Sequence, residues 1–176
     1  AYPDANERHY AFMLEGLQDT EETLRQRGIR LIVRIGSPET VVLSMAADAA
    51  MIVCDQGYLR HQVQWRRQVA RQAACRVVQV ESDVVVPVEA ASDKCEYAAQ
   101  FLRRKLNRLI DEYLEKVPVI KPKKKAGSLN LAGENLERPD ALMKKLGIDR
   151  SVPAVPLFFN GGTRQAQQVL NRFIQS

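Results

Sequence analysis

The chain has 176 residues, of which 45% are hydrophobic, and its formal net charge is +5 at pH 7. This length and composition suit one soluble globular domain with its own core, with room for a tail. No apolar stretch approaches the roughly 20 residues that span a bilayer, and no basic-then-apolar leader is visible at the start. The charge permits a nucleic-acid partner but is too small to indicate one by itself.

The three cysteines, Cys54, Cys75 and Cys95, lie far apart along the chain. This pattern is typical of reduced thiols in a cytoplasmic protein and does not indicate a disulfide framework. Neither the cysteines nor the two histidines have the spacing of a metal site, so no metal ligands are predicted. The sequence also contains no P-loop and no nucleophile elbow, so no catalytic residue is predicted.

A helix followed by a strand opens the chain. Apolar side chains recur at helical spacing over residues 7–27, and Gly28 is a natural stop. Residues 30–35 are short, apolar and β-branched, which predicts a strand. The sharp turn at Gly36-Ser37-Pro38 then starts a helix that runs to about Asp48, with the serine as its N-cap.

Two further strands are predicted over residues 49–54 and 76–80, and an arginine-rich helix over residues 59–74 separates them. Strands that alternate with helices favour parallel pairing, with right-handed crossovers and helices on both faces. The predicted fold class is therefore α/β: a doubly wound, Rossmann-like parallel sheet with flanking helices, followed by a linker and a helix.

The alternation of predicted strands and helices stops after the third strand. The apolar, proline-containing run over residues 84–88 is predicted to be an extended or edge segment. A long amphipathic helix is predicted over residues 94–116. Ser92 or Asp93 would cap this helix, and Glu96 would reach back to complete a capping box.

The rest of the chain is predicted to be a linker and two helices. Prolines, a glycine and a run of three lysines mark residues 117–137 as a linker, and helices are predicted over residues 140–146 and from Thr163 onward. We predict three parts: part of an α/β domain over residues 1–92, a long helix and interdomain linker over residues 93–137, and the start of a further region over residues 138–176.

The loops that follow the first two predicted strands form the candidate ligand site. They contain Gly36, Ser37, Asp55 and Tyr58. In open α/β sheets ligands bind at the carboxyl ends of strands, and helix N-termini there offer free N–H groups to anions or ring carbonyls. The alternative is two ordinary turns, because no complete G-x-G-x-x-G is present.

Two basic helices are candidate contact surfaces. In the helix over residues 59–74, arginines could bind phosphate and Trp65 could stack on bases. However, Trp65 shares an apolar face with Val69, which favours core packing over stacking on bases. The second basic cluster consists of Arg103, Arg104 and Arg108. It is either a docking surface for another domain or a solvated helix face.

Six groups of motifs occur in order along nearly the whole chain. They are Y-A-F-M-L-E-G-L from Tyr10, G-S-P from Gly36, V-C-D with L-R and Q-W from Val53, V-E-S-D with V-P-V from Val80, S-D-K-C-E-Y-A-A from Ser92, and F-N-G-G from Phe159. Together these motifs resemble class II DNA photolyases of the photolyase/cryptochrome family. The resemblance covers the N-terminal α/β antenna domain and the segment that leads on from it.

The resemblance implies a function. Such a photolyase uses light to repair cyclobutane pyrimidine dimers in DNA, with a reduced FAD that donates an electron to the dimer and takes it back. The FAD and the site for damaged DNA belong to a C-terminal helical domain, and the N-terminal domain holds an antenna pigment, often a deazaflavin or a folate. On this basis the candidate ligand site would bind the pigment, and the second basic cluster would dock against the next domain.

The resemblance also implies that the sheet is incomplete at its N-terminus. The family's first strand, first helix and second strand are expected before Tyr2, and the FAD-binding helices after the last helix. We therefore expect this chain alone not to repair DNA, and to self-associate through exposed strand edges without a membrane partner. The alternative is a non-catalytic, flavodoxin-like nucleotide-binding or interaction module derived from the same fold.

Overall fold

The structure, a computed structural model, describes residues 4–126 and 130–176. The chain divides into two compact units. One unit is continuous and runs from Gly36 to Val119, and the other joins Ala1–Ile35 to Ile120–Ser176. The predicted boundaries at residues 92 and 137 stay a prediction. None of the described helices has a stretch long and apolar enough to cross a bilayer.

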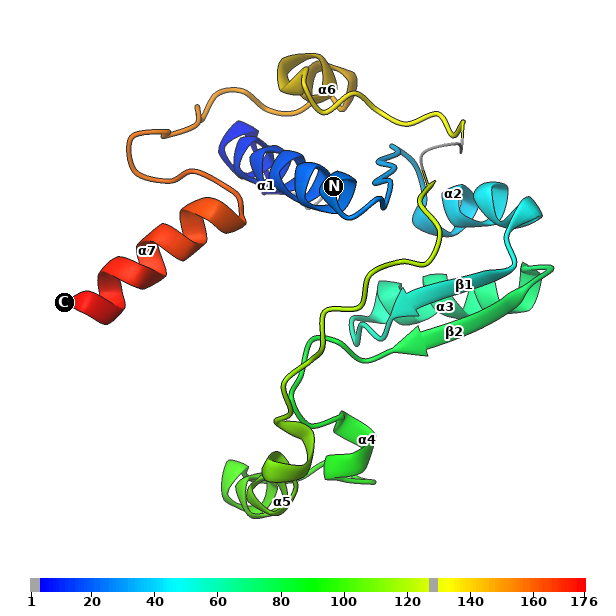
Figure 1. Cartoon of the computed structure of the whole chain (residues 1–176), viewed down its shortest axis with the longest axis vertical. Helices are drawn as coiled ribbons and strands as arrows, with labels where there is room; N and C mark the ends of the chain where they lie inside the picture. The colour runs from blue at the N-terminus through cyan, green and yellow to red at the C-terminus, as the bar shows by residue number, and fades with distance from the viewer. Residues whose placement is uncertain (1–3, 127–129) are drawn as a thin grey trace. The chain divides into compact units, whose positions relative to one another are not determined.

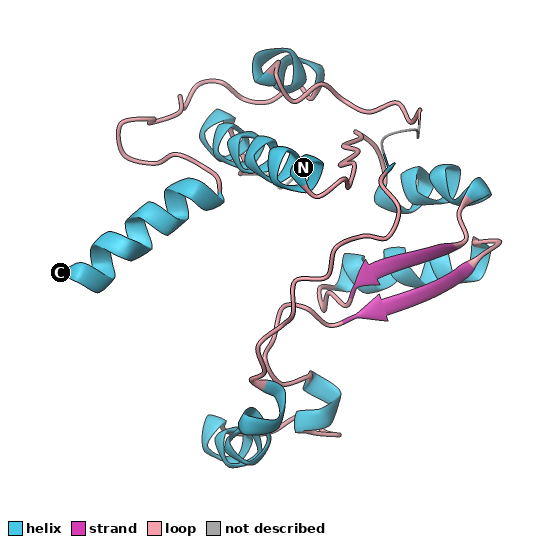
Figure 2. Ribbon diagram, in the orientation of Figure 1, coloured by secondary structure: helices cyan, strands magenta, loops and turns pink. Residues whose placement is uncertain are grey.

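The continuous unit is an α/β arrangement. Its elements in chain order are α2 (Pro38–Met45), the short 3-10 helix η1 (Ala46–Asp48), β1 (Met51–Asp55), α3 (Arg60–Gln72), β2 (Arg76–Val80), α4 (Val88–Ala91) and α5 (Ala99–Tyr113) (Figure 1). Strands β1 and β2 pair in parallel, and α3 makes the crossover between them (Figure 2). The predicted α/β class, with a parallel sheet flanked by helices, is confirmed.

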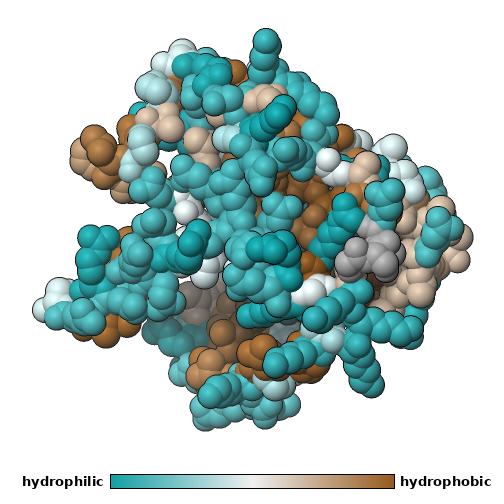
Figure 3. Space-filling view, turned by 45° about the horizontal axis from the view of Figure 1, so that its top comes forward, coloured by the Kyte–Doolittle hydropathy of each residue, from teal (hydrophilic) through white to brown (hydrophobic). Residues whose placement is uncertain are grey.

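The two strands form where the sequence is short, apolar and β-branched. Their register sets Val53 opposite Val78 and Asp55 opposite Val80, so these pairs share one face of the sheet. On that face Val53 is 56% exposed and Val80 is 48% exposed. Apolar side chains also reach the protein surface in the space-filling view (Figure 3). The sheet therefore keeps one partly open apolar face.

The long helix predicted over residues 94–116 is shorter, because α5 begins only at Ala99. The predicted cap is wrong in its role. The hydroxyl of Ser92 donates to Glu96 Oε1 at 2.8 Å, and Lys105 Nζ lies 2.6 Å from the same carboxylate oxygen. Because Lys105 of α5 pairs with the Glu96 carboxylate, Ser92 and Glu96 hold the segment before α5 against the helix. They do not cap its first turn.

The discontinuous unit consists of α1 (Glu7–Gln26), α6 (Pro139–Lys145), α7 (Thr163–Gln175) and extended segments. Its core contains the buried side chains of Leu14, Leu136, Leu142 and Met143. The predicted helices over residues 7–27 and 140–146, and the last helix, are confirmed. Glu7 connects the two chain segments of the unit, because its carboxylate accepts two 3.0 Å hydrogen bonds from Arg150.

The strand predicted over residues 30–35 is wrong, because this segment is extended but belongs to no sheet. Its neighbours are Ala126 and Glu134. Two backbone hydrogen bonds make the contacts, from Ala126 N to Gly28 O and from Glu134 N to Val33 O, both 2.8 Å. A β-branched sequence favours an extended backbone, but a strand also needs a continuous ladder with a neighbour.

The start of α7 is held against α1 by two acids one turn apart. The N–H of Gly161 donates to Glu15 Oε2 at 2.6 Å, and the N–H of Arg164 donates to Asp19 Oδ2 at 3.0 Å. Carboxylates at a helix N-terminus satisfy its free N–H groups and face its positive dipole end. A Cβ on Gly161 would collide with the carbonyl oxygen of Phe12, so only glycine permits this approach.

Candidate functional site

The loops at the carboxyl ends of β1 and β2 are joined by side-chain hydrogen bonds. Asp55, the last residue of β1, accepts a 2.5 Å hydrogen bond on Oδ1 from the hydroxyl of Ser82. The parallel register produces this contact, because Asp55 lies opposite Val80, two residues before Ser82. Among the described residues the other carboxylate oxygen, Oδ2, has no hydrogen-bond partner and is available to a ligand donor.

A second bridge joins Tyr58 to Glu81. The phenol donates a short hydrogen bond to Glu81 Oε1, and Gln56 Nε2 donates to the phenol oxygen at 3.1 Å. The N–H of Val88 at the start of α4 lies 3.2 Å from both oxygens of the same carboxylate. The hydrogen bond to Glu81 raises the pKa of Tyr58 above its usual value of 10.0, because it favours the protonated phenol.

The structure therefore brings Asp55 and Tyr58 into one cluster, which we call the strand-end cluster: Asp55, Tyr58, Glu81 and Ser82. Sequence reasoning missed Glu81 and Ser82 as members. A signal was present, since both follow the third predicted strand and parallel strands end at the same edge of a sheet. The hydroxyl groups of Tyr58 and Ser82 donate within the cluster, so Asp55 Oδ2 is left to accept from an N–H or hydroxyl group of a ligand.

Gly36 and Ser37 lie at the start of α2 and are not hydrogen-bonded to this cluster in the described part of the chain. Gly36 has φ of +156°, and a Cβ there would lie 2.8 Å from Val41 Cγ2. The carbonyl of Ser37 accepts the first helical hydrogen bond, from Val41 N at 3.0 Å. Ser37 is therefore the predicted N-cap by backbone position, but its hydroxyl caps no N–H group.

Glu39, in the first turn of α2, carries an orphaned polar atom. Its Oε2 is shielded from solvent and has no hydrogen-bond partner within residues 4–126 and 130–176. A shielded carboxylate oxygen is costly to leave unsatisfied. It fits a ligand that donates a hydrogen bond at the α2 start, two residues from Ser37. Glu39 Oε2 and Asp55 Oδ2 can therefore each accept a hydrogen bond from an N–H or hydroxyl group of a ligand.

Most arginines of the two predicted contact surfaces are exposed, whereas Arg66 is half-buried and donates to the carbonyl of Gly57 at 2.6 Å. Arg103, Arg104 and Arg108 lie on α5, and their role in docking stays a prediction. Along α3 the exposed arginines are Arg60, Arg67 and Arg71. None of these six takes part in an ion pair with another described residue.

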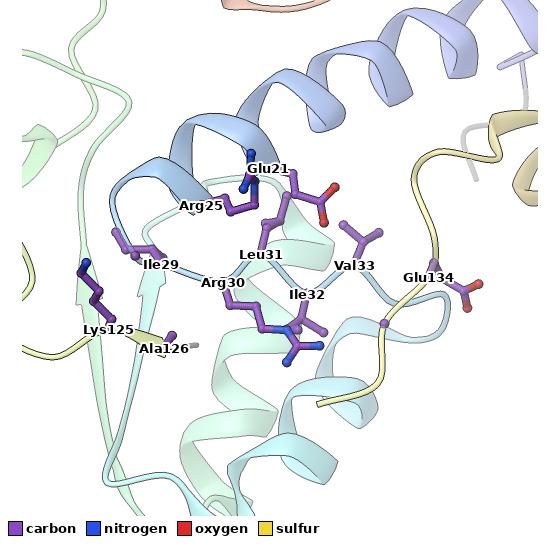
Figure 4. A pocket seen from close by; sticks show the side chains of 12 residues that line it. Glu21, Arg25, Ile29, Arg30, Leu31, Ile32, Val33, Lys125, Ala126 and Glu134 are labelled. Carbon is purple, nitrogen blue, oxygen red and sulfur yellow. The ribbon is translucent and has the colours of Figure 1, made fainter. Parts of the chain in front are cut away.

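A pocket of about 540 Å³ lies in the discontinuous unit (Figure 4). Its walls are the segment from Gly28 to Val33, side chains of α1, and the segments around Lys125 and Glu134. Acids and bases both line it, with Glu21 and Arg25 coming from α1 (Figure 4). None of the predicted site residues lies in this pocket. In the described residues, no group of three or more acids, cysteines or histidines could hold a metal.

Known proteins resemble this chain over most of its length. A family model described as DNA photolyase matches residues 2–123. A protein named deoxyribodipyrimidine photo-lyase from Methanothermobacter thermautotrophicus is 40% identical over 175 residues, which are 99% of this chain and 38% of the relative. One of the same name from Potorous tridactylus is 32% identical over 64% of this chain and 22% of the relative. One from Arabidopsis thaliana is 29% identical over 69% of this chain and 25% of the relative. The chain therefore spans less than two fifths of the length of these relatives.

Proposed function

Because the chain belongs to the DNA photolyase family, we propose that it is the N-terminal, antenna-binding part of a class II deoxyribodipyrimidine photolyase. The whole protein would act in light-driven repair of cyclobutane pyrimidine dimers. The observation that carries this proposal is the 40% identity to an archaeal deoxyribodipyrimidine photo-lyase over 99% of the chain. The class and the antenna role also rest on the ordered motifs and on the strand-end cluster.

The antenna site would use the strand-end cluster and the start of α2. Asp55 Oδ2 and Glu39 Oε2 would accept hydrogen bonds from ring N–H or hydroxyl groups, and the backbone at Gly36 and Ser37 would approach the ligand closely. The bridge from Tyr58 to Glu81 would hold the loop in place. When bound, a deazaflavin or folate supplies light absorption and energy transfer to an FAD held elsewhere in the whole protein.

Two partners belong to the same proposal. Damaged DNA would bind to the C-terminal region of the whole protein in the cytoplasm, while this chain by itself would self-associate through its sheet. The support is the half-exposed apolar face with Val53 and Val80. Light scattering tests the second part. We expect a mass of at least two chains for the wild type and a lower mass for Val53→Lys, and a compact wild-type monomer would contradict self-association.

The pigment site is tested by retention of a deazaflavin or a folate on the 176-residue chain. The absorbance that co-elutes with the protein in gel filtration measures it. We expect the wild type to retain one of the two, and Asp55→Ala and Glu39→Ala each to retain several-fold less. Asp83→Ala is the matched control, because Asp83 is an exposed acid in the same loop as Ser82 but makes no hydrogen bond to the cluster. Equal retention by all variants, or none by the wild type, would overturn the proposed site.

A further inference from the structure

One face of α3 consists of arginine and glutamine. Its members are Arg60, Gln64, Arg67, Gln68, Arg71 and Gln72, and we call them the α3 stripe. At 100° per residue the three arginines and Gln64 fall within a narrow sector of the helix, and the other two glutamines lie on one side of it. Together with Val63 these side chains line an open groove of about 660 Å³. The stripe is thus a continuous polar surface of one sign of charge.

The charge of the stripe is uncompensated. Helix α3 contains no acidic residue. Ion pairs elsewhere in the described chain neutralise other basic side chains, such as Arg150 with Glu7 and Lys105 with Glu96. The arginines of the stripe have no such partner among the described residues. An exposed basic surface without acids attracts a polyanion.

The side chains of the stripe suit phosphate groups. Guanidinium groups bind phosphate oxygens in a bidentate manner, and glutamine amides donate to the same oxygens. With a rise of 1.5 Å per residue, the arginines from position 60 to position 71 span about 16 Å of helix. Each strand of a DNA duplex carries a phosphate about every 3.4 Å of its axis. The three arginines can therefore meet different phosphates of one strand.

The aromatic rings of α3, those of His61 and Trp65, lie beside the glutamine edge of the stripe and away from its arginines. Trp65 is partly buried and packs edge-on against His61, with ring centroids 4.7 Å apart. At helical spacing Trp65 lies on the same side as Val69, which is 6% exposed. A surface that binds single strands by base stacking needs exposed aromatic rings. No aromatic ring of α3 lies among the arginines, and both rings are half-buried, which favours the backbone of a duplex.

We propose that the α3 stripe binds the phosphate backbone of double-stranded DNA without sequence specificity. The choice of DNA among polyanions rests on the proposed function. The stripe would be a second DNA contact, apart from the damage site of the whole protein, and would raise the affinity for undamaged flanking duplex.

Fluorescence anisotropy of a labelled, undamaged 20-base-pair duplex, titrated with the 176-residue chain at several salt concentrations, tests this proposal. The variant Arg60→Gln/Arg67→Gln/Arg71→Gln should bind about tenfold more weakly or worse at low salt. The slope of log affinity against log salt should fall in magnitude by about 2.7, since each phosphate contact contributes roughly 0.9. Circular dichroism checks that the variant is folded.

The matched control is Lys121→Gln/Lys123→Gln/Lys124→Gln, which removes the same charge from exposed residues outside α3. We expect it to lower affinity and salt slope clearly less than the arginine variant. Equal losses of affinity and salt slope in both variants would show that DNA binding depends on net charge alone, and would overturn the proposal. So would no binding by the wild type, or binding to phosphatidylserine vesicles but not to the duplex. Pigment retention is measured separately, so failure here leaves the antenna site standing.

Discussion

Lys105 Nζ lies 2.6 Å from Glu96 Oε1 and also donates to Ser92 Oγ at 2.9 Å. The lysine thereby connects α5 to the chain that precedes it. The Glu96 side chain is only 11% exposed, whereas that of Lys105 is 36% exposed. Removing the lysine would leave a shielded carboxylate without its main partner.

We expect Lys105→Met to lower the melting temperature of the continuous unit. Methionine keeps the length and the apolar stem of lysine but loses its charge and donors. Lys116→Met removes the same charge from an exposed residue that makes no ion pair in the described chain, and it should leave the melting temperature nearly unchanged. Differential scanning calorimetry of both variants measures the effect, and equal melting temperatures would refute a structural role for this ion pair.

The discontinuous unit should lose stability in acid. Hydrogen bonds from Arg150 lower the pKa of Glu7 from its usual 4.5, and the backbone N–H of Arg164 lowers that of Asp19 from 3.8. Both folded-state pKa values lie below the unfolded ones, so the stabilisation is complete above the unfolded pKa and is lost as the pH falls through the folded pKa. The unfolding midpoint of this unit should therefore be independent of pH above about pH 5 and decrease as the pH falls below 5. Glu7→Gln should flatten that fall, and an unchanged acid profile would count against the assignment.

The phenol of Tyr58 should lose its proton at a higher pH than an ordinary tyrosine. Because its hydrogen bond to Glu81 raises the phenol pKa, the stabilisation is complete below pH 10.0, the usual pKa of tyrosine, and is lost as the pH rises through the folded value. Glu81→Gln removes the carboxylate and should move this pKa back toward its usual value. Difference absorbance of the phenolate measures it, with Tyr58→Phe to identify the signal. An identical titration curve for Glu81→Gln would show that the bridge does not form in solution.

Two glycines at the contact of α1 with α7 should respond to alanine in opposite ways. At Gly161 an added Cβ would strike the carbonyl oxygen of Phe12, so alanine should destabilise by roughly 1–3 kcal/mol. At Gly16, inside α1, the nearest atom to a new Cβ is Gly162 N at 3.7 Å. There alanine should stabilise by about 0.5–1 kcal/mol through its higher helix propensity. Urea unfolding measures both, and a loss of similar size at Gly16 would contradict the ordinary van der Waals contact described there.

Sequence patterns predicted best those elements whose formation depends on local residues. The strand Arg76–Val80 and the helix Glu7–Gln26 follow from periodicity and stop signals. Residues 30–35 have the same composition as a strand, but pairing depends on a neighbour that their own sequence does not specify. Likewise, the place of Asp55 after a strand predicts it as a site residue from local sequence, whereas its hydrogen bond to Ser82 depends on the register between two strands that α3 separates.

The division into one continuous and one discontinuous unit has a consequence for synthesis. Leu14 of α1 packs with Leu136, Leu142 and Met143, so this core is complete only after more than 120 further residues have been made. All residues from Gly36 to Val119 leave the ribosome before these partners. The inserted unit can therefore close its short-range contacts first, while the apolar side of α1 stays exposed on the nascent chain. During that interval the apolar side of α1 is open to contact with a chaperone.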